Sequence, residues 1–407
     1  MQPDITFLTN DADLTSAREE WQRFALHSPN PHVFSSVIWF DAWRHAFGKN
    51  KKIGLLRVRQ AGEIIAIQPM MIEAVRRGPA LSALYDYAVE DIDFLEQRPR
   101  FRFLPIRQLS GLINLEAGNI RSLPLFGNNG MGSSDLAPYL KAMQKISHWD
   151  VGRLVCTGSE IQPYLQTLRE AGFGAFAKQH FMPLYGLELK PWDDYFASRS
   201  RIFRKNFRYT VEQVTKEKKQ FIAREYIGRD NVADALEKLF ALARRSWKST
   251  GRKGESVVIP LTERAAEFYR YICLTPSSEV VPYVQLLFDG DTVFSGMLAL
   301  FYKDRLFGCQ TYFDPDYARF SPGRLLFREM ITHGHAHGAR IMDLNGGSQF
   351  VKHFSDFSDN YYQILVFNTR PYARLLHVLA KWLSNDLLSA EHAPSTEGNE
   401  NHDDHGH

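Results

Sequence analysis

The sequence predicts an α+β fold of two similar lobes, each a mixed, mainly antiparallel sheet flanked by helices. Three observations lead to this prediction. The 407 residues suggest two domains at roughly 150 residues per domain. A helical pattern followed by a β-hairpin occurs twice, which indicates a weak internal repeat. Late in the chain a strand, a helix and another strand follow one another, and a right-handed crossover of this kind makes the two strands parallel.

The first helix and hairpin lie within residues 33–71. Segments 53–59 and 63–71 are short and rich in Ile, Leu and Val, so they predict two strands joined by the turn Gln60-Ala61-Gly62. The preceding segment, 33–47, places four aromatic side chains on one helical face: Trp39, Phe40, Trp43 and Phe47.

The second copy begins with a helix for which Asn231 is the expected N-cap. Its hairpin consists of strands 282–288 and 292–302, joined through Asp289-Gly290-Asp291, a strong turn signal. A third strand, 305–313, follows after a tight turn.

The strand-helix-strand unit completes this lobe. Ser321 is expected to cap the helix and Pro322 to be its first residue, where a missing amide proton does no harm. Gly338 should supply the left-handed exit. Residues 341–345 form the next strand, which we expect to run parallel to 305–313.

The lobes are expected to divide near Lys190-Pro191, giving an N-terminal lobe of residues 1–191 and a C-terminal lobe of residues 192–390. Residues 391–407 are polar and lack aromatic side chains, so they are expected to form a disordered tail. Residues 372–388 predict an amphipathic helix whose apolar side includes Leu375, Leu376, Leu379, Trp382 and Leu383. We expect it to pack on the second lobe; the alternative is docking to a membrane surface.

Composition excludes several classes of protein. Hydrophobic residues make up 44% and charged residues 23%, so the bulk of the chain is not disordered. The net charge of +3 is too small for wholesale binding of nucleic acid, and any basic site must be local. The three cysteines are far apart and fit a reducing compartment. Because no signal-like N-terminus or membrane-length apolar run is present, we expect a full-length, cytoplasmic protein, with peripheral contact at the inner membrane as its one membrane role.

Two clusters of side chains invite a ligand. Arg201, Arg204, Lys205 and Arg208 would form one positive stripe if residues 192–215 are helical, and like charges this close repel unless an anion lies among them. The anion would be CoA, a nucleotide-linked sugar, a lipid phosphate or the backbone of tRNA; the alternative is a solvated face. The histidines of the segment HGHAHG, residues 333–338, indicate an exposed helix end, and we expect no metal site.

The segment from Tyr312 to Gly323 (YFDPDYARFSPG), followed by Asp343 and Lys352, resembles the GNAT-superfamily acyltransferases of the BioF2-like or CelD type, relatives of the FemAB proteins. The residues from Arg201 to Tyr209 match the basic segment of that family, and Arg245 with Trp247 matches its Arg-Trp helix. The similarity spans roughly residues 30 to 370. Two positions differ from the family pattern: no second small residue follows Gly323, and Val351 replaces a Tyr.

The resemblance implies two tandem GNAT-like lobes with the donor site in the second. The expected catalytic residues are Asp343, Lys352 and Tyr312. The turn before the helix, which offers unpaired amides to a pyrophosphate, is expected to bind the donor through Arg319, Ser321, Gly323 and Arg324. The expected anion- or substrate-binding residues are Arg204, Lys205, Arg208, Arg245 and Trp247.

The function implied is N- or O-acyl transfer from acyl-CoA, acetyl-CoA or a longer chain, to an amine or hydroxyl of a small or envelope-related acceptor, in exopolysaccharide or cellulose biosynthesis. One alternative is a FemAB-like transferase that takes an aminoacyl group from tRNA. Another is a non-catalytic scaffold in polysaccharide synthesis. The sequence leaves the donor, the acceptor and the oligomeric state open.

Overall fold

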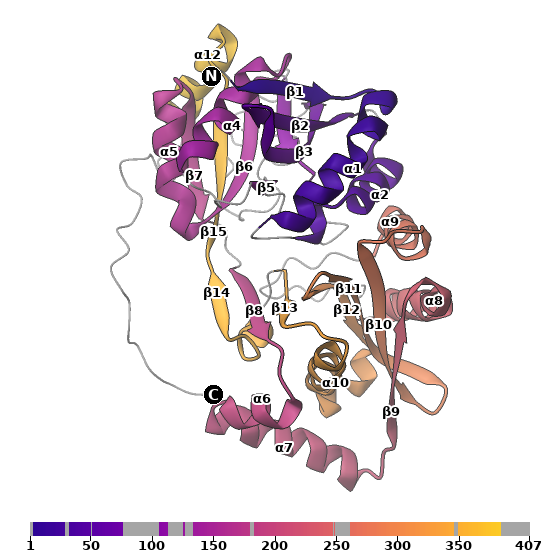
Figure 1. Cartoon of the computed structure of the whole chain (residues 1–407). Coiled ribbons are helices and arrows are strands. Elements are labelled where there is room, and N and C mark those ends of the chain that lie inside the picture. Colours follow the sequence, from indigo (N-terminus) through magenta and orange to yellow (C-terminus); the bar gives the residue numbers. More distant parts are fainter. Residues whose placement is uncertain are drawn as a thin grey trace.

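The computed structural model describes residues 3–28, 32–49, 51–75, 106–112, 125–126, 133–179, 183–246, 248, 261–345 and 349–383. Over these residues the chain forms two mixed sheets flanked by helices, which confirms the predicted α+β fold with two lobes (Figure 1).

The first sheet has eight strands in the described residues: β1 (Asp4–Leu8), β2 (Lys52–Gln60), β3 (Glu63–Val75), β4 (Ile106–Gly111), β5 (Leu125–Phe126), β6 (Val151–Thr157), β7 (Gly174–Gln179) and β15 (Tyr361–Phe367). Their order is β1-β2-β3-β4-β6-β15-β7, with β5 paired to β3. Antiparallel pairs dominate, and β4 runs parallel to β6.

The second sheet has seven strands within the described ranges: β8 (Leu184–Glu188), β9 (Phe221–Ile227), β10 (Val280–Asp289), β11 (Thr292–Tyr302), β12 (Arg305–Phe313), β13 (Ile341–Asp343) and β14 (Phe357–Asp359). Their order is β14-β8-β13-β12-β11-β10-β9. The predicted parallel pair is confirmed, because β12 runs parallel to β13.

The α-helices of the described chain are α1 (Asp11–His27), α2 (Val37–Phe47), α4 (Ser133–Lys145), α5 (Ile161–Glu170), α6 (Trp192–Ser198), α7 (Arg201–Lys216), α8 (Arg229–Arg245), α9 (Glu263–Leu274), α10 (Pro322–Ala336), α11 (Gln349–Lys352) and α12 (Pro371–Leu383). Three short 3₁₀ turns add η1 (Val33–Ser35), η3 (Gly158–Glu160) and η4 (Pro315–Phe320). Within these residues, none of the helices combines the length and the apolar character that a membrane crossing requires.

The internal repeat is more extensive than a helix and a hairpin. The order β1-α1-α2-β2-β3-β4-α4-β6 returns as β9-α8-α9-β10-β11-β12-α10-β13. In each copy a helix, α4 or α10, connects the two parallel strands. Each lobe therefore has the same build.

The two sheets are interleaved in the sequence. β8 belongs to the second sheet although it precedes residue 191, and β15 belongs to the first sheet although it follows residue 192. Sheet membership therefore does not follow the expected division into 1–191 and 192–390, and as a boundary between domains that division stays a prediction. The expected tail, 391–407, lies outside the described residues.

Several local predictions are confirmed in detail. Ala61 and Gly62 both have positive φ, as a tight hairpin turn between β2 and β3 requires. β11 and β12 have the predicted bounds, α10 begins at Pro322, and Gly338 has φ of +84°.

Other local features differ in part from what the sequence suggested. Residues 192–215, which form one positive stripe only if they are helical, are divided into α6 and α7, because the Ser200 side chain accepts a hydrogen bond from the Phe203 amide and starts a new helix. α8 begins before Asn231, at the residue after Gly228. Ser321 precedes α10 with φ of +48° but its side chain caps no backbone amide; it accepts a hydrogen bond from Arg324 instead.

The C-terminal helix also differs from its prediction. α12 packs on β15 and β7 of the first sheet, not on the second lobe. Leu376 is buried there, but Leu375 is 54% exposed and does not belong to the buried side. Residues 384–388 of the expected helix lie outside those described, as do the surroundings of the Trp382 and Leu383 side chains.

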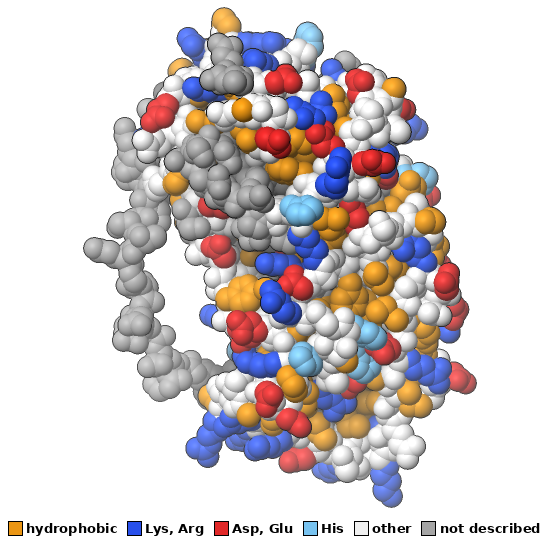
Figure 2. All heavy atoms as spheres, in the orientation of Figure 1, with side chains coloured by type: hydrophobic (Ala, Val, Ile, Leu, Met, Phe, Trp, Pro, Cys, Tyr) orange, Lys and Arg blue, Asp and Glu red, His pale blue; other side chains and the backbone are white. Residues whose placement is uncertain are grey.

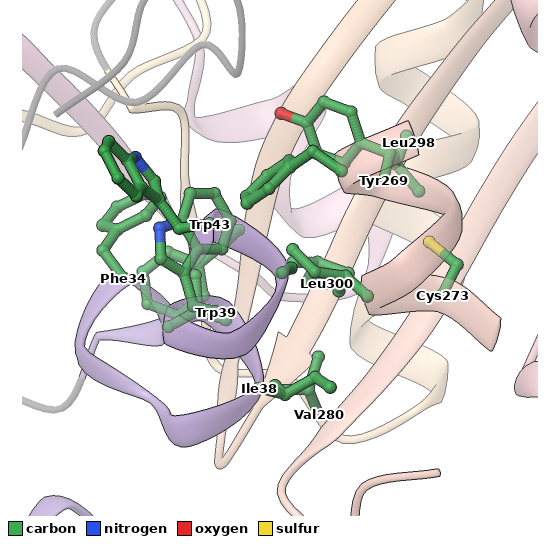
Figure 3. Close-up of a cluster of buried hydrophobic side chains, with 14 of the residues drawn as sticks. Phe34, Ile38, Trp39, Trp43, Tyr269, Cys273, Val280, Leu298 and Leu300 are labelled. Carbon is green, nitrogen blue, oxygen red and sulfur yellow. The ribbon is translucent and has the colours of Figure 1, made fainter. Parts of the chain in front are cut away.

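A layer of helices joins the lobes. α1 and α2 from the first lobe share one hydrophobic cluster with α8, α9 and the inner face of the second sheet. The ring of Trp39 meets that of Phe268 edge-on at 4.8 Å between centroids, and Phe34 reaches Phe307 of β12 at 5.8 Å. Figure 3 shows side chains of α2 facing α9 and the second sheet within this cluster.

One carboxyl group is buried at the edge of this layer. Both oxygens of Glu279, just before β10, are inaccessible to solvent, and the Val37 amide approaches them without the geometry of a well-formed hydrogen bond. Burial raises the pKa of Glu279 to about 7, and the Val37 amide at the start of α2 opposes the shift. Folding thus favours the protonated carboxyl, so the stability of the wild type falls as pH rises from about 4.5 towards 7.

We predict that Glu279→Gln stabilises the protein at pH 8 by about 1 kcal/mol, the low end of the cost of an unsatisfied buried polar group, and has little effect near pH 4.5. Chemical denaturation at both pH values measures this. The control is Glu267→Gln, at an exposed position of α9. Equal stabilisation at both pH values would show that the Glu279 carboxyl does not titrate in this range.

Candidate functional site

The two parallel strands of the second lobe separate partway along their length. β12 pairs with β13 over three residues only, the last pair being Phe307 with Asp343, whereas β12 continues to Phe313. A bulge at Cys309 shifts the register of β12 on β11 at the same level. In the part of the chain that the structure describes, no strand pairs with this edge of β12 beyond Phe307. The fork therefore presents a strand edge whose amides can donate hydrogen bonds to a ligand.

Asp343 lies at the base of the fork. Its carboxylate Oδ1 accepts a hydrogen bond from the Asn345 amide at 2.9 Å, and Asn345 has φ of +51°. The carboxyl thus stabilises the turn by which the chain leaves β13. It also lies near the thiol of Cys309, whose pKa is raised by burial first, then by Cys273 and by Asp343.

Tyr312 points away from α10 into the helix layer. It is 1% exposed, its hydroxyl donates to Gln310 Oε1 at 2.8 Å, and the Gln310 amide donates to the Tyr269 hydroxyl at 3.4 Å. Burial raises the pKa of Tyr312, so the phenol keeps its proton. The Lys248 ammonium lies over the ring of Tyr312 at 5.0 Å.

Lys248 is a candidate that the sequence did not indicate. Burial lowers its pKa to about 8, so a substantial fraction of the amine is neutral near physiological pH. Nothing in the sequence pattern distinguishes Lys248 from neighbouring cations, since its desolvation comes from packing against Tyr312 and its surroundings. The adjacent Trp247, an expected anion- or substrate-binding residue, lies outside the described residues.

The start of α10 holds the expected donor-binding residues. Gly323 lies in its first turn, but a Cβ placed there would be 2.8 Å from the Phe350 ring, so this ring covers the glycine. The Arg324 guanidinium donates to Ser321 Oγ at 3.1 Å and to Thr210 Oγ1 at 3.4 Å. Arg319 is exposed and pairs with Glu217 at 2.8 Å.

A pocket of about 440 Å³ lies beside this turn. Ile202, Phe203 and Asn206 of α7 form one wall, and Arg324 of α10 with Phe350 and His353 form another. The Arg199 guanidinium on its rim pairs with Asp356 and donates to the Ser355 carbonyl at 3.0 Å. Of the expected site residues, Arg324 is the one that lines this pocket.

The other expected residues lie apart from it. Arg204 is turned inward and donates to the carbonyls of Ala197 and Arg199 at 2.6 and 3.0 Å, where it caps α6. Lys205 and Arg208 are exposed on the outer face of α7. Arg245 pairs with Asp314 at 3.0 Å and so ties α8 to the loop after β12. Lys352 is exposed at the end of α11.

Two histidines at the C-terminal end of α10 lie beside a carboxylate. His333 Nδ1 and His337 Nε2 lie 3.1 and 3.0 Å from the same Oε2 of Glu225. Over the residues described, no group of three or more His, Cys, Asp or Glu side chains is suited to hold a metal ion.

Comparison with known proteins identifies the type of domain. Residues 202–354 match the family described as "Acetyltransferase (GNAT) domain". The matched segment contains the fork, the start of α10, Asp343 and Lys352. No curated protein matches the sequence.

Two solved structures share the fold over most of their length. The structure titled "Crystal structure of FemX" has 11% identity and a TM-score of 0.55, covering 92% of this chain and 100% of that one. A conserved protein of unknown function from Bacteroides thetaiotaomicron VPI-5482 has 10% identity and a TM-score of 0.50, covering 89% and 100%. At these identities the likeness concerns the fold. The chain therefore has two tandem GNAT-like lobes, and residues 202–354 of the second are similar to the GNAT acetyltransferase domain.

We predict that a small amine-acylating reagent labels Lys248 half-maximally near pH 8, because burial lowers its pKa. Mass spectrometry after brief exposure at a series of pH values measures the labelling of each lysine. Lys238 is the internal comparison, since its hydrogen bond to Asp234 raises its pKa. Parallel labelling curves for the two lysines would exclude a desolvated Lys248.

Proposed function

We propose that this protein is an acyltransferase that moves an acyl group from an acyl-CoA thioester to an amine or hydroxyl of an envelope- or exopolysaccharide-related acceptor. The observation that carries the proposal is the fork between β12 and β13, with Asp343 at its base and the α10 start following β12. The GNAT domain match supports it, because that segment contains all of these parts. The BioF2-like or CelD type is the finer part of the same proposal.

The reaction needs an acceptor, a base and donors to the oxyanion around the thioester carbonyl. The acceptor nitrogen or oxygen bonds to the thioester carbonyl carbon and loses its proton to a base. The carbon–sulfur bond then breaks, and the CoA thiolate takes up a proton. Amides on the unpaired edge of β12 are placed to donate to the oxyanion that forms between these steps.

Two groups are candidates for the base. Asp343 lies at the fork itself, and Lys248 is partly neutral near pH 8. Tyr312 keeps its proton and supports Lys248 through its ring, so we assign it a positioning role. Lys352 is exposed and does not line the pocket, so we assign it an electrostatic role.

The start of α10 suits a pyrophosphate in one respect and resists it in another. The first-turn amides and the helix dipole favour an anion, and Arg319 and Arg324 add positive charge. The Phe350 ring, however, covers Gly323, so the ring must move before a phosphate reaches that backbone. Phe350 is 37% exposed, and its ring packs on those of Phe327 and Phe354 at 5.7 and 5.3 Å between centroids.

Two alternatives each have one observation in their favour. The exposed cations of α7 would suit the tRNA of a FemAB-like aminoacyl transferase, whose binding should fall steeply with salt. The covered Gly323 would suit a non-catalytic scaffold. A thermal-shift panel of acyl-CoAs of different chain lengths, alongside tRNA, separates the three, because a ligand that binds the folded state raises its melting temperature.

We predict that saturating acyl-CoA raises the melting temperature of the wild type and that Gly323→Asp abolishes this shift, since a carboxylate at the helix start repels the phosphates. Thr332→Asp is the matched control, because it adds the same charge at an exposed position of α10 far from its first turn. If no acyl-CoA shifts the wild type, the donor assignment fails.

We predict that Asp343→Asn lowers turnover by about a hundredfold, the usual scale for losing a general base. The fold should persist, because the Asn side-chain oxygen can still accept the hydrogen bond from the Asn345 amide. Steady-state rates with an identified acceptor measure the effect, and the acyl-CoA thermal shift serves as the control for donor binding. Turnover within threefold of the wild type would limit Asp343 to its structural role in the turn.

A further inference from the structure

The outer face of α7 is the most unusual surface among the described residues. We propose that it docks the protein on an anionic lipid surface and that the neighbouring pocket receives an acceptor anchored in that surface. In the second part the inference rests on the proposed function. The docking itself does not.

The positive charges on this face repel one another and the positive end of the helix dipole. Arg201, Lys205 and Arg208 follow one another at helical spacings of four and three and are all exposed. They lie in the first half of α7, next to the positive end of its dipole, and its first turn contains no acidic residue. Over the described chain none of the three pairs with a carboxylate, whereas Arg199, Arg245 and Arg319 nearby all do.

Apolar side chains are exposed among these cations. Ile202 is 73% exposed, the highest value for a large hydrophobic side chain in the described residues, and Tyr209 is 58% exposed. Ile202 and Tyr209 are seven residues apart and share a face that borders the cations. Figure 2 shows Lys and Arg side chains gathered at the lower end of the molecule, where Figure 1 places α6 and α7.

This combination favours a lipid surface over a nucleic acid. Both partners supply phosphates for Arg201, Lys205 and Arg208. A bilayer also supplies an apolar layer beneath its phosphates, into which an exposed Ile can insert, and an interfacial region that suits the amphipathic ring of Tyr. RNA offers base faces that would stack on Tyr209 but leaves Ile202 exposed to water.

The pocket opens onto the same face. Ile202 lines the pocket and is also the most exposed large hydrophobic side chain of the docking surface, so the mouth of the pocket lies at the edge of that surface. Asn206, one turn further along α7, also lines the pocket. A headgroup that carries the acceptor could therefore enter while its chains remain in the bilayer.

The opposite end of the molecule provides a matched comparison. Leu375 and Val378 on α12 are 54% and 62% exposed, and α12 lies at the other end of the molecule from α7 (Figure 1). A flat membrane cannot contact both helices at once. Variants of α12 thus remove comparable apolar area from a surface that, under this proposal, does not touch the membrane.

The experiment measures cosedimentation of the full chain, without any donor, with vesicles of phosphatidylcholine alone or containing about 30% phosphatidylglycerol. We expect binding to the anionic vesicles only, weakening as salt is added. Replacement of Arg201, Lys205 and Arg208 by Gln should lower the partition coefficient by about 100-fold, since each cation near an anionic surface contributes about fivefold. Ile202→Gln with Tyr209→Gln should also weaken binding, whereas Leu375→Gln with Val378→Gln should leave it unchanged.

Other results overturn the proposal. Equal binding to neutral and anionic vesicles, or loss of binding in the α12 variant alone, would place the contact elsewhere. Binding of tRNA that needs the three cations but not Ile202, with no vesicle binding, would identify the face as a nucleic-acid surface. The vesicle experiment contains no donor. A failure of the acyl-CoA thermal shift therefore does not affect the conclusion on docking, and a failure of vesicle binding does not affect the conclusion on the donor.

Discussion

The packing of α2 against α9 is the contact on which the rest of the structure depends. Each helix leads into the first hairpin of its lobe, so a ring contact such as that of Trp39 with Phe268 fixes two sheets at once. Large aromatic side chains supply much of the buried area of the cluster around it. The Glu279 carboxyl at its edge opposes this packing at neutral pH, because burial disfavours its charged form.

The helix layer also gives the two faces of the second sheet different surroundings. Its inner face packs on α8 and α9, which immobilises Tyr312, Gln310 and Tyr269 in one hydrogen-bonded chain. Its outer face packs on α10, and the strands beneath that helix separate at Asp343. A rigid inner face beside an open fork can position the reacting atoms of a ligand, because the groups that contact the ligand lie on regular strands.

The sequence predicted what local chemistry determines. The turn at Ala61-Gly62 and the exit at Gly338 depend on backbone conformations that few residues adopt, so their positions were predictable. The interleaving of β8 and β15 depends on pairing between distant segments, which no local pattern reports. The apolar residues keep their helical spacing across Ser200, so the sequence pattern does not reveal that the helix breaks there. Lys248 was missed because desolvation depends on packing, and Arg245 was taken for a ligand-binding cation because its partner, Asp314, lies 69 residues away.

The cations of α7 show within a single helix that sequence spacing does not determine where a side chain points. By spacing alone Arg204 belongs with Lys205 and Arg208, yet its guanidinium turns inward because the carbonyls at the end of α6 need a donor. This inward turn leaves Arg201, Lys205 and Arg208 on the outer face and Ile202 with Asn206 on the pocket wall. α7 thus has a structural, a pocket-lining and a solvent-facing side within its first two turns. A helix so divided can connect a surface contact to a pocket without any change in fold, because one residue, Ile202, belongs to both.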